Sequence, residues 1–151
     1  MNETQGVSEP VDPKLIGIGG WLTFTAIGFV LGPIMGVIGI IVALGLFSQV
    51  ADAGFGGIYA LEIVALIGLV AFMIYAATRF FGKKRNAPAV IITYLLVSLG
   101  TSAVLLVIEL AAGAELFAVE TGKQLVREVV AAAIWIPYFR VSKRVKATFV
   151  N

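Results

Sequence analysis

Four charged residues interrupt apolar stretches of this sequence and are the first side chains that could do chemistry. They are Glu62, Glu109, Arg127 and Glu128. A carboxylate surrounded by hydrocarbon either takes up a proton or pairs with a cation, and Arg127 is the obvious basic partner within the apolar stretches. The sequence therefore predicts a charge cluster in which Arg127 meets Glu62 or Glu109, with Glu62 the deepest. In the alternative interpretation, each charge lies near a helix end and reaches water.

The residue types that most enzymes use are absent. The chain has no histidine and no cysteine, which removes the commonest general base, the commonest metal ligand and any thiolate nucleophile. Glu62, Glu109 and Arg127 could in principle perform acid–base chemistry. However, the sequence predicts no catalytic, cofactor-binding or metal-binding set. We therefore expect a protein that is not an enzyme and that uses no cofactor.

A row of polar residues follows one face of the third apolar stretch. Its members are Tyr94, Ser98, Thr101 and Ser102, continued by Glu109. At about 100° per residue, these positions share roughly a third of the helix circumference. In lipid, such a stripe either holds helices together or lines a water-filled path. We expect the first, because serine and threonine can return their hydrogen bonds to the preceding turn.

The elements that carry these residues are long apolar helices. Of the 151 residues, 60% are hydrophobic and 13% are charged, whereas soluble domains average roughly 45–50% and 25%. A fold of this size must then be solvated by lipid. The expected fold is an all-α integral membrane protein with four transmembrane helices. The predicted segments are a polar tail at 1–13, a transmembrane domain at 14–146 with spans at about 20–47, 58–81, 89–112 and 125–141, and a basic tail at 142–151.

The basic residues predict the orientation of these spans. Nine of the eleven bases fall on the side of the two termini and of the loop between the second and third spans, and only Lys123 and Arg127 fall on the other. Cytoplasmic segments of membrane proteins carry the excess of Lys and Arg. Both termini are therefore expected in the cytoplasm. The nine are Lys14, Arg79, Lys83, Lys84, Arg85, Arg140, Lys143, Arg144 and Lys146.

Small residues line one face of the first span. Gly28, Gly32, Gly36 and Gly39 form overlapping GxxxG patterns, which let helix backbones approach closely in lipid. We expect a packing seam inside the bundle, and homo-oligomerisation through this face is the sharper alternative. Pro33 is the expected site of a kink.

The stretch WIPYFRVSKRVKATF, residues 135–149, joins an apolar face to a basic one. Trp135 and Tyr138 are expected at the membrane boundary, and Pro137 is expected to bend the exiting helix towards the membrane plane. Each base near an anionic leaflet contributes about 1 kcal/mol, so the tail is predicted to bind anionic headgroups. Four bases are too few to favour a nucleic-acid site. The bases are Arg140, Lys143, Arg144 and Lys146.

Two motifs together resemble a known family. GIGGWL at 17–22 and the tail at 135–149 are similar to the small bacterial membrane proteins of domain-of-unknown-function family 2569. The signature positions are Trp135, Pro137, Tyr138, Ser142, Lys143, Arg144, Val145 and Lys146, and Arg127 matches a basic position at the start of the last helix. The resemblance implies a four-helix protein of the bacterial inner membrane. It implies no activity.

The sequence is compatible with two functions of different classes. The first expectation is a non-enzymatic accessory or scaffold module that acts through helix packing and its basic tail. The alternative is an oligomeric channel or transporter that uses the polar stripe and the acidic residues. The expected partners are membrane lipids with anionic headgroups and either a second copy of the chain or another membrane protein. No nucleic acid is expected. The two functions differ in whether the stripe of the third span faces a hydrated cavity or a dry helix seam.

Overall fold

The computed structural model describes residues 17–150, and in this part of the chain all regular structure is helical. The helices are α1 (Trp21–Asp52), α2 (Gly56–Phe81), α3 (Ala87–Ala111), α4 (Glu115–Val141) and α5 (Lys143–Thr148). The predictions on residues 1–13 and on Lys14 lie outside the described residues. The first three spans agree with α1, α2 and α3 to within a few residues, although α1 continues to Asp52.

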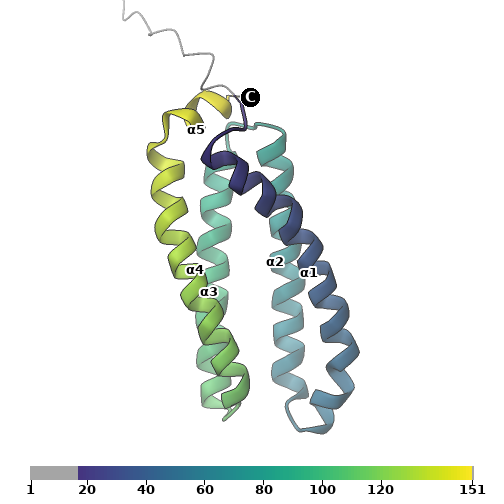
Figure 1. Ribbon diagram of the computed structural model, residues 1–151. Coiled ribbons are helices and arrows are strands. Elements are labelled where there is room, and N and C mark those ends of the chain that lie inside the picture. Colours follow the sequence, from purple (N-terminus) through teal and green to yellow (C-terminus); the bar gives the residue numbers. More distant parts are fainter. Residues whose placement is uncertain (1–16, 151) are drawn as a thin grey trace, which may run out of the picture.

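The four long helices form two antiparallel hairpins, α1 with α2 and α3 with α4 (Figure 1). Each hairpin packs closely along its length, and a smaller contact between α2 and α3 joins them. The short α5 lies across the end of the bundle where the described chain begins and ends (Figure 1). This arrangement puts the α1–α2 and α3–α4 turns together at the opposite end.

Helices α1, α2 and α3 are long and apolar enough to cross a membrane, with mean hydropathies of 2.6, 2.3 and 2.3. Most of their large apolar side chains are exposed, which is the expected surface of a protein in lipid. Helix α4 does not reach the same apolarity over the described residues, because its first half carries five charged side chains. These are Glu115, Glu120, Lys123, Arg127 and Glu128.

The start of α4 corrects the predicted boundaries. The mixed charges of residues 111–123 predict a loop there, followed by the fourth span at 125–141. Instead, only a short turn follows Ala111, with Gly113 in the left-handed region at φ 70°, and α4 begins at Glu115. The charges in the first half of α4 lowered the apparent apolarity without preventing a helix, because Glu, Lys, Gln and Arg are good helix formers.

The glycines of α1 pack against α2. A Cβ atom at Gly36 would lie 2.5 Å from Val70 Cγ2, one at Gly32 would overlap the Met73 side chain, and one at Gly39 would lie 3.8 Å from Leu66 Cδ2. Gly28 is outside this seam, since nothing lies within 4 Å of the same position there. The predicted internal seam is therefore present for three of the four glycines. Because α2 occupies it, this face is not available for homo-oligomerisation.

The end of the bundle that carries α5 contains the main apolar core. Leu22 and Phe80 are 0% exposed, and Phe149 packs its ring 5.5 Å from that of Phe80. Trp135 contributes from α4 and meets Trp21 edge to face at 6.3 Å. The core thus closes only when residues from both ends of the described chain come together.

The C-terminal stretch is folded against the bundle and is not a continuous exit helix. Pro137 lies within α4, and the direction changes at Ser142, whose backbone is extended and whose Oγ accepts a hydrogen bond from Val145 N at 3.4 Å. Thr148 Oγ1 donates to Gly17 O and accepts from Gly17 N, both at 3.2 Å. The expected bend at Pro137 is therefore wrong, because the N-cap of α5 sets the turn.

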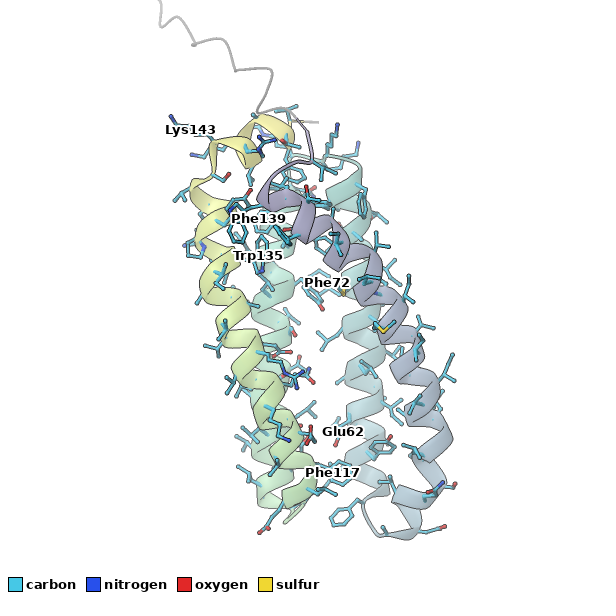
Figure 2. The ribbon with its side chains drawn as sticks, in the orientation of Figure 1. Glu62, Phe72, Phe117, Trp135, Phe139 and Lys143 are labelled. Carbon is cyan, nitrogen blue, oxygen red and sulfur yellow. The ribbon has the colours of Figure 1, made fainter. Side chains whose placement is uncertain are left out.

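The predicted apolar face of the tail is buried in protein. Val145 is 2% exposed and Phe149 is 4% exposed, so these side chains cannot also insert into lipid. Trp135 and Tyr138 pack against the same core. Among the bases, Arg140, Lys143 and Lys146 are exposed, whereas Arg144 lies over Gly19 and Gly20 (Lys143 is labelled in Figure 2). The tail is therefore a helical cap with three outward bases, and the binding of anionic headgroups by these bases stays a prediction.

The seam gives a test of glycine packing. Gly36→Ala should lower the free energy of unfolding by about 1–3 kcal/mol, because the β-branched Val70 cannot move aside easily. Gly28→Ala should leave stability unchanged or slightly raised, since its site is open and alanine favours the helix. Unfolding of both variants in detergent micelles, followed by circular dichroism, measures the difference. Equal losses at the two positions would contradict the seam.

The cap gives a second test, which separates packing from charge. Phe149→Ala should increase deuterium uptake in residues 143–150, because it removes the ring contact with Phe80. The triple variant Arg140→Gln, Lys143→Gln, Lys146→Gln should leave that uptake unchanged in anionic nanodiscs. The opposite order of effects would show that lipid charge, and not the core, holds the cap.

Candidate functional site

Two carboxyl groups lie close together in the half of the bundle away from α5, and a third lies further along the α3–α4 hairpin. Glu62 comes from α2 and Glu109 from α3, and Glu62 lies near Phe117 towards the hairpin turns (Figure 2). Glu128 of α4 instead contacts Ser98, about three helical turns before Glu109 on α3. Because α3 contacts both α2 and α4, its polar face meets an acidic residue from each neighbour.

Glu109 is the most deeply buried of the three. Its side chain is 0% exposed. Thr121 Oγ1 of α4 donates a 2.9 Å hydrogen bond to Glu109 Oε1, while Oε2 is buried without a hydrogen-bond partner. Glu62 lies close enough to interact directly with Glu109, and Glu62 Oε1 is likewise buried and unpartnered. Two carboxyl groups thus face each other with unused oxygen atoms between them.

Glu128 is held by two side chains. Ser98 Oγ of α3 donates to Glu128 Oε1 at 2.7 Å, and Gln124 Nε2 donates to the same oxygen at 3.1 Å. Glu128 Oε2 has no hydrogen-bond partner and is buried. Tyr94 lies one helical turn before Ser98 and is near enough to interact electrostatically with Glu128. The polar stripe of α3 therefore meets acidic residues over much of its length.

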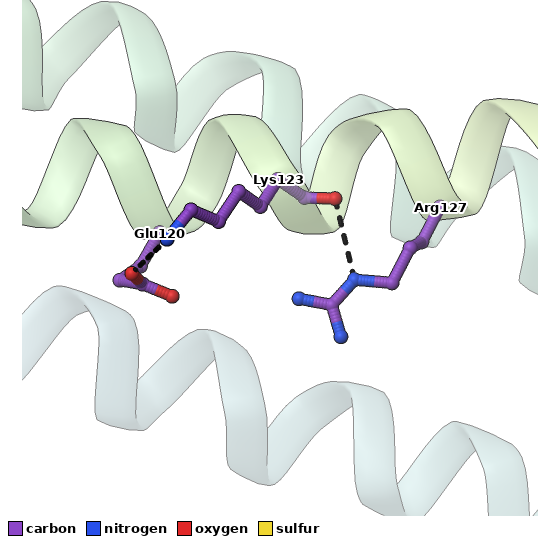
Figure 3. A network of polar contacts seen from close by, with 3 residues as sticks. All are labelled: Glu120, Lys123 and Arg127. Atoms are coloured by element: carbon purple, nitrogen blue, oxygen red, sulfur yellow. Dashed lines mark hydrogen bonds and ion pairs between the residues drawn. The ribbon is translucent and has the colours of Figure 1, made fainter.

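Arg127 does not join these carboxyl groups. Its Nε donates to Lys123 O at 3.3 Å, and Lys123 Nζ forms an ion pair of 2.7 Å with Glu120 (Figure 3). Arg127 forms no ion pair with any residue from 17 to 150. The expected contact of Arg127 with Glu62 or Glu109 is wrong, because Arg127 and Glu128 are adjacent on α4 and point to different faces. Arg127 is exposed, whereas Glu128 turns inward.

A cleft of about 160 Å³ runs beside the carboxyl groups. Its polar lining comes from Tyr59 and Glu62 of α2, Thr101 and Ser102 of α3, and Thr121 and Gln124 of α4. A second hollow of about 370 Å³ shares Glu62, Thr121 and Gln124 with it and also includes Glu120 and Arg127. The two hollows therefore adjoin each other, and the exposed Arg127 lines the one that also includes Leu116 and Phe117 near the hairpin turn.

The sequence reasoning missed Thr121 and Gln124. The predicted loop at 111–123 includes Thr121, and Gln124 lies one residue before the predicted fourth span at 125–141. A usable signal was present, because Thr121, Gln124 and Glu128 are spaced i, i+3, i+7 and so share one helix face. That face is the one that α4 turns towards α3.

The chemistry available here is that of oxygen ligands and exchangeable protons. The lining groups are carboxyl, hydroxyl and amide groups, without an amine or imidazole among them. No group of acidic residues in the described part of the chain has a geometry that could hold a metal ion. Carboxyl groups withdrawn from water without a basic partner hold protons or attract a mobile cation.

The Glu109–Thr121 contact can be tested by a double-mutant cycle. Thr121→Val should lower the free energy of unfolding by about 1–3 kcal/mol, because it leaves Glu109 buried without its donor. The double variant Glu109→Leu, Thr121→Val should recover much of that loss, since no unsatisfied group remains. Thr93→Val is the matched control, because Thr93 is exposed and bonds only Ala89 O of its own helix. Additive losses in the cycle would rule out the coupling.

Comparison with known proteins fits this architecture. The model of a family described as "protein of unknown function (DUF2569)" matches residues 15–150. The "Inner membrane protein YdgK" of Escherichia coli K12 is 34% identical over 97 residues, which cover 62% of this chain and 61% of that protein. No solved structure matches the chain. The resemblance found in the two end motifs is thus confirmed over nearly the whole sequence, and the chain belongs to the DUF2569 family of proteins of unknown function.

Proposed function

We propose that this protein takes up protons or small cations in the polar cleft that Glu62 lines and works as a channel or transporter subunit of the inner membrane. One observation carries the proposal: the polar stripe of α3 borders a cleft with Glu62. The stripe is packed against α4 at Ser98, whereas Thr101 and Ser102 border the cleft, and packing alone requires no such opening. The expectation of an accessory or scaffold module has no observation of its own in its favour and stays a prediction.

The proposed topology has four spans with both termini in the cytoplasm. The exposed bases at the α5 end and in the α2–α3 turn support this orientation under the positive-inside rule. Helix α4 runs beside α3 in the opposite direction over a comparable length, so it is proposed to cross wherever α3 does. Its polar groups would be sheltered because Thr121 and Gln124 line the cleft and Glu128 accepts a hydrogen bond from Ser98 of α3. The E. coli relative is named as an inner membrane protein, which supports a location in the inner membrane.

The charges of the site support a cationic or protonic solute. Glu62, Glu109 and Glu128 have no basic partner within residues 17–150, and each has a buried oxygen atom without a hydrogen bond. In a medium of low dielectric constant, bringing a cation or a proton to these oxygens relieves the cost of burying them. Arg127 stands at the mouth, where it is near enough to influence entry but outside the inner cleft.

Proteoliposomes provide the test. Vesicles with internal pyranine and an imposed inside-negative potential should acidify faster with the protein than without it. Glu62→Gln should reduce the rate to that of empty vesicles, because it removes the exchangeable proton from the cleft. Asp52→Asn is the matched control, since Asp52 is exposed at the end of α1 and lines neither hollow, and it should retain the rate.

A sodium-uptake measurement shows whether the solute is a proton or a small cation. Uptake of radioactive sodium that is lost in Glu62→Gln, without a change in pyranine signal, would identify a small cation as the cargo. Absence of both fluxes in vesicles that contain well-folded protein would contradict the proposal.

A further inference from the structure

A second hollow lies in the other half of the bundle, near the end that carries α5. It has a volume of about 160 Å³ and shares no lining residue with the carboxylate cleft. All four long helices contribute to it, and four aromatic rings, Phe24, Phe29, Trp135 and Phe139, form much of its wall. Trp135 and Phe139 are seen in this half of the bundle in Figure 2. We call this hollow the aromatic pocket.

Gly28 keeps the aromatic pocket open. It lines the pocket, and nothing lies within 4 Å of where its Cβ would be. At Gly32 and Gly36, side chains of α2 occupy the space where a Cβ atom would lie. At Gly28 this space is empty. The α1 and α4 helices do not pack closely, which leaves this side of the bundle accessible to molecules dissolved in the bilayer.

Two hydroxyl groups belong to this otherwise apolar pocket. Thr25 Oγ1 is buried and has no hydrogen-bond partner. Tyr94, which also lines the pocket, makes ring and electrostatic contacts but no hydrogen bond within residues 17–150. A threonine in a helix can satisfy itself by bonding to the preceding turn, as Thr93 does. Thr25 does not, so a buried donor in a low-dielectric region is left for an acceptor from outside the chain.

The volume defines the size of such a ligand. An apolar cavity of about 150 Å³ in another protein accepts one benzene ring, and the aromatic pocket has nearly the same volume. Aromatic walls favour a planar ring, because ring pairs gain about 0.5–1.5 kcal/mol beyond simple burial. A lipid acyl chain would fill the space but would leave both hydroxyl groups without acceptors.

We propose that the aromatic pocket binds the ring of a membrane-soluble quinone, with its carbonyl oxygens accepting hydrogen bonds from Thr25 and Tyr94. A quinone combines the three features that the pocket selects for: one planar ring, an apolar character that concentrates it in lipid, and two acceptor oxygens. The proposal concerns binding and includes no redox step. It is independent of cation uptake at the carboxylate cleft, since the two sites share no lining residue.

Tryptophan fluorescence provides a direct readout, because the chain has two tryptophans and one lines the pocket. Trp21→Phe leaves Trp135 as the reporter and keeps a ring at position 21. The purified protein in nanodiscs is titrated with 2,6-dimethyl-1,4-benzoquinone, which has a single ring. The expected result is saturable quenching of Trp135 superimposed on weak collisional quenching.

Three further variants, each in the Trp21→Phe background, test the assignment. Gly28→Leu should abolish the saturable component by filling the pocket. Thr25→Val should raise the half-saturating concentration about fivefold, the equivalent of one ordinary hydrogen bond. Gly45→Leu is the control, because Gly45 is exposed on the same helix with nothing within 4 Å and lies outside the pocket. It should behave like the parent.

Three results would overturn the proposal. Strictly collisional quenching that all variants share would show that no quinone site exists. Quenching of Trp135 by brominated acyl chains that Gly28→Leu relieves, without saturable quenching by the quinone, would assign the pocket to a lipid chain. If p-xylene, which has a ring but no carbonyl oxygens, competed as strongly as a single-ring quinone, the carbonyl oxygens would play no part in binding.

Discussion

The surrounding lipid can accept no hydrogen bonds, and most of this structure follows from that constraint. Each polar side chain within the long helices has to find its partner on another helix, on its own helix or at an end of the bundle. Helix α3 meets the constraint by turning Ser98, Ser102 and Glu109 towards its neighbours, where all three are buried. Helix α4 supplies Thr121, Gln124 and Glu128 in return. The α3–α4 hairpin is therefore held in large part by polar contacts.

The α1–α2 hairpin satisfies the same constraint by a different route. Helix α1 has no charged residue between Trp21 and Phe47, and it approaches α2 through Gly32, Gly36 and Gly39. Close backbone packing gives the dispersion contacts that hydrophobic burial cannot give in lipid. Polar side chains thus help to specify the α3–α4 hairpin, whereas glycines, which have no side chain, specify the α1–α2 hairpin. Hollows remain where the two kinds of hairpin meet, one lined by Glu62 with hydroxyl and amide groups and one largely by aromatic rings.

The sequence was informative wherever one helix alone determines the result. Apolar length predicted α1, α2 and α3, and the spacing of small residues predicted a packing seam on α1, although not that α2 is its partner. It was less informative where the result depends on two helices at once. The choice between Arg127 and Glu128 as the inward residue depends on the rotation of α4 about its axis, which its neighbour α3 sets. The fate of the tail was missed for a similar reason, because the burial of Val145 and Phe149 requires Phe80 and Leu22, which come from the other hairpin.

The pair of hydrogen bonds between Gly17 and Thr148 joins residues 131 positions apart, and it imposes an order on assembly. Domains synthesised on a ribosome begin to fold from the N-terminal side, so both hairpins can form before residues 142–149 exist. Leu22 and Phe80 then wait at an open end of the bundle until α5 emerges. Closure of this long loop adds little entropic cost, since that cost grows only with the logarithm of loop length. The cap is therefore a last step of biogenesis, and a chain that stops short of it leaves that apolar end uncovered.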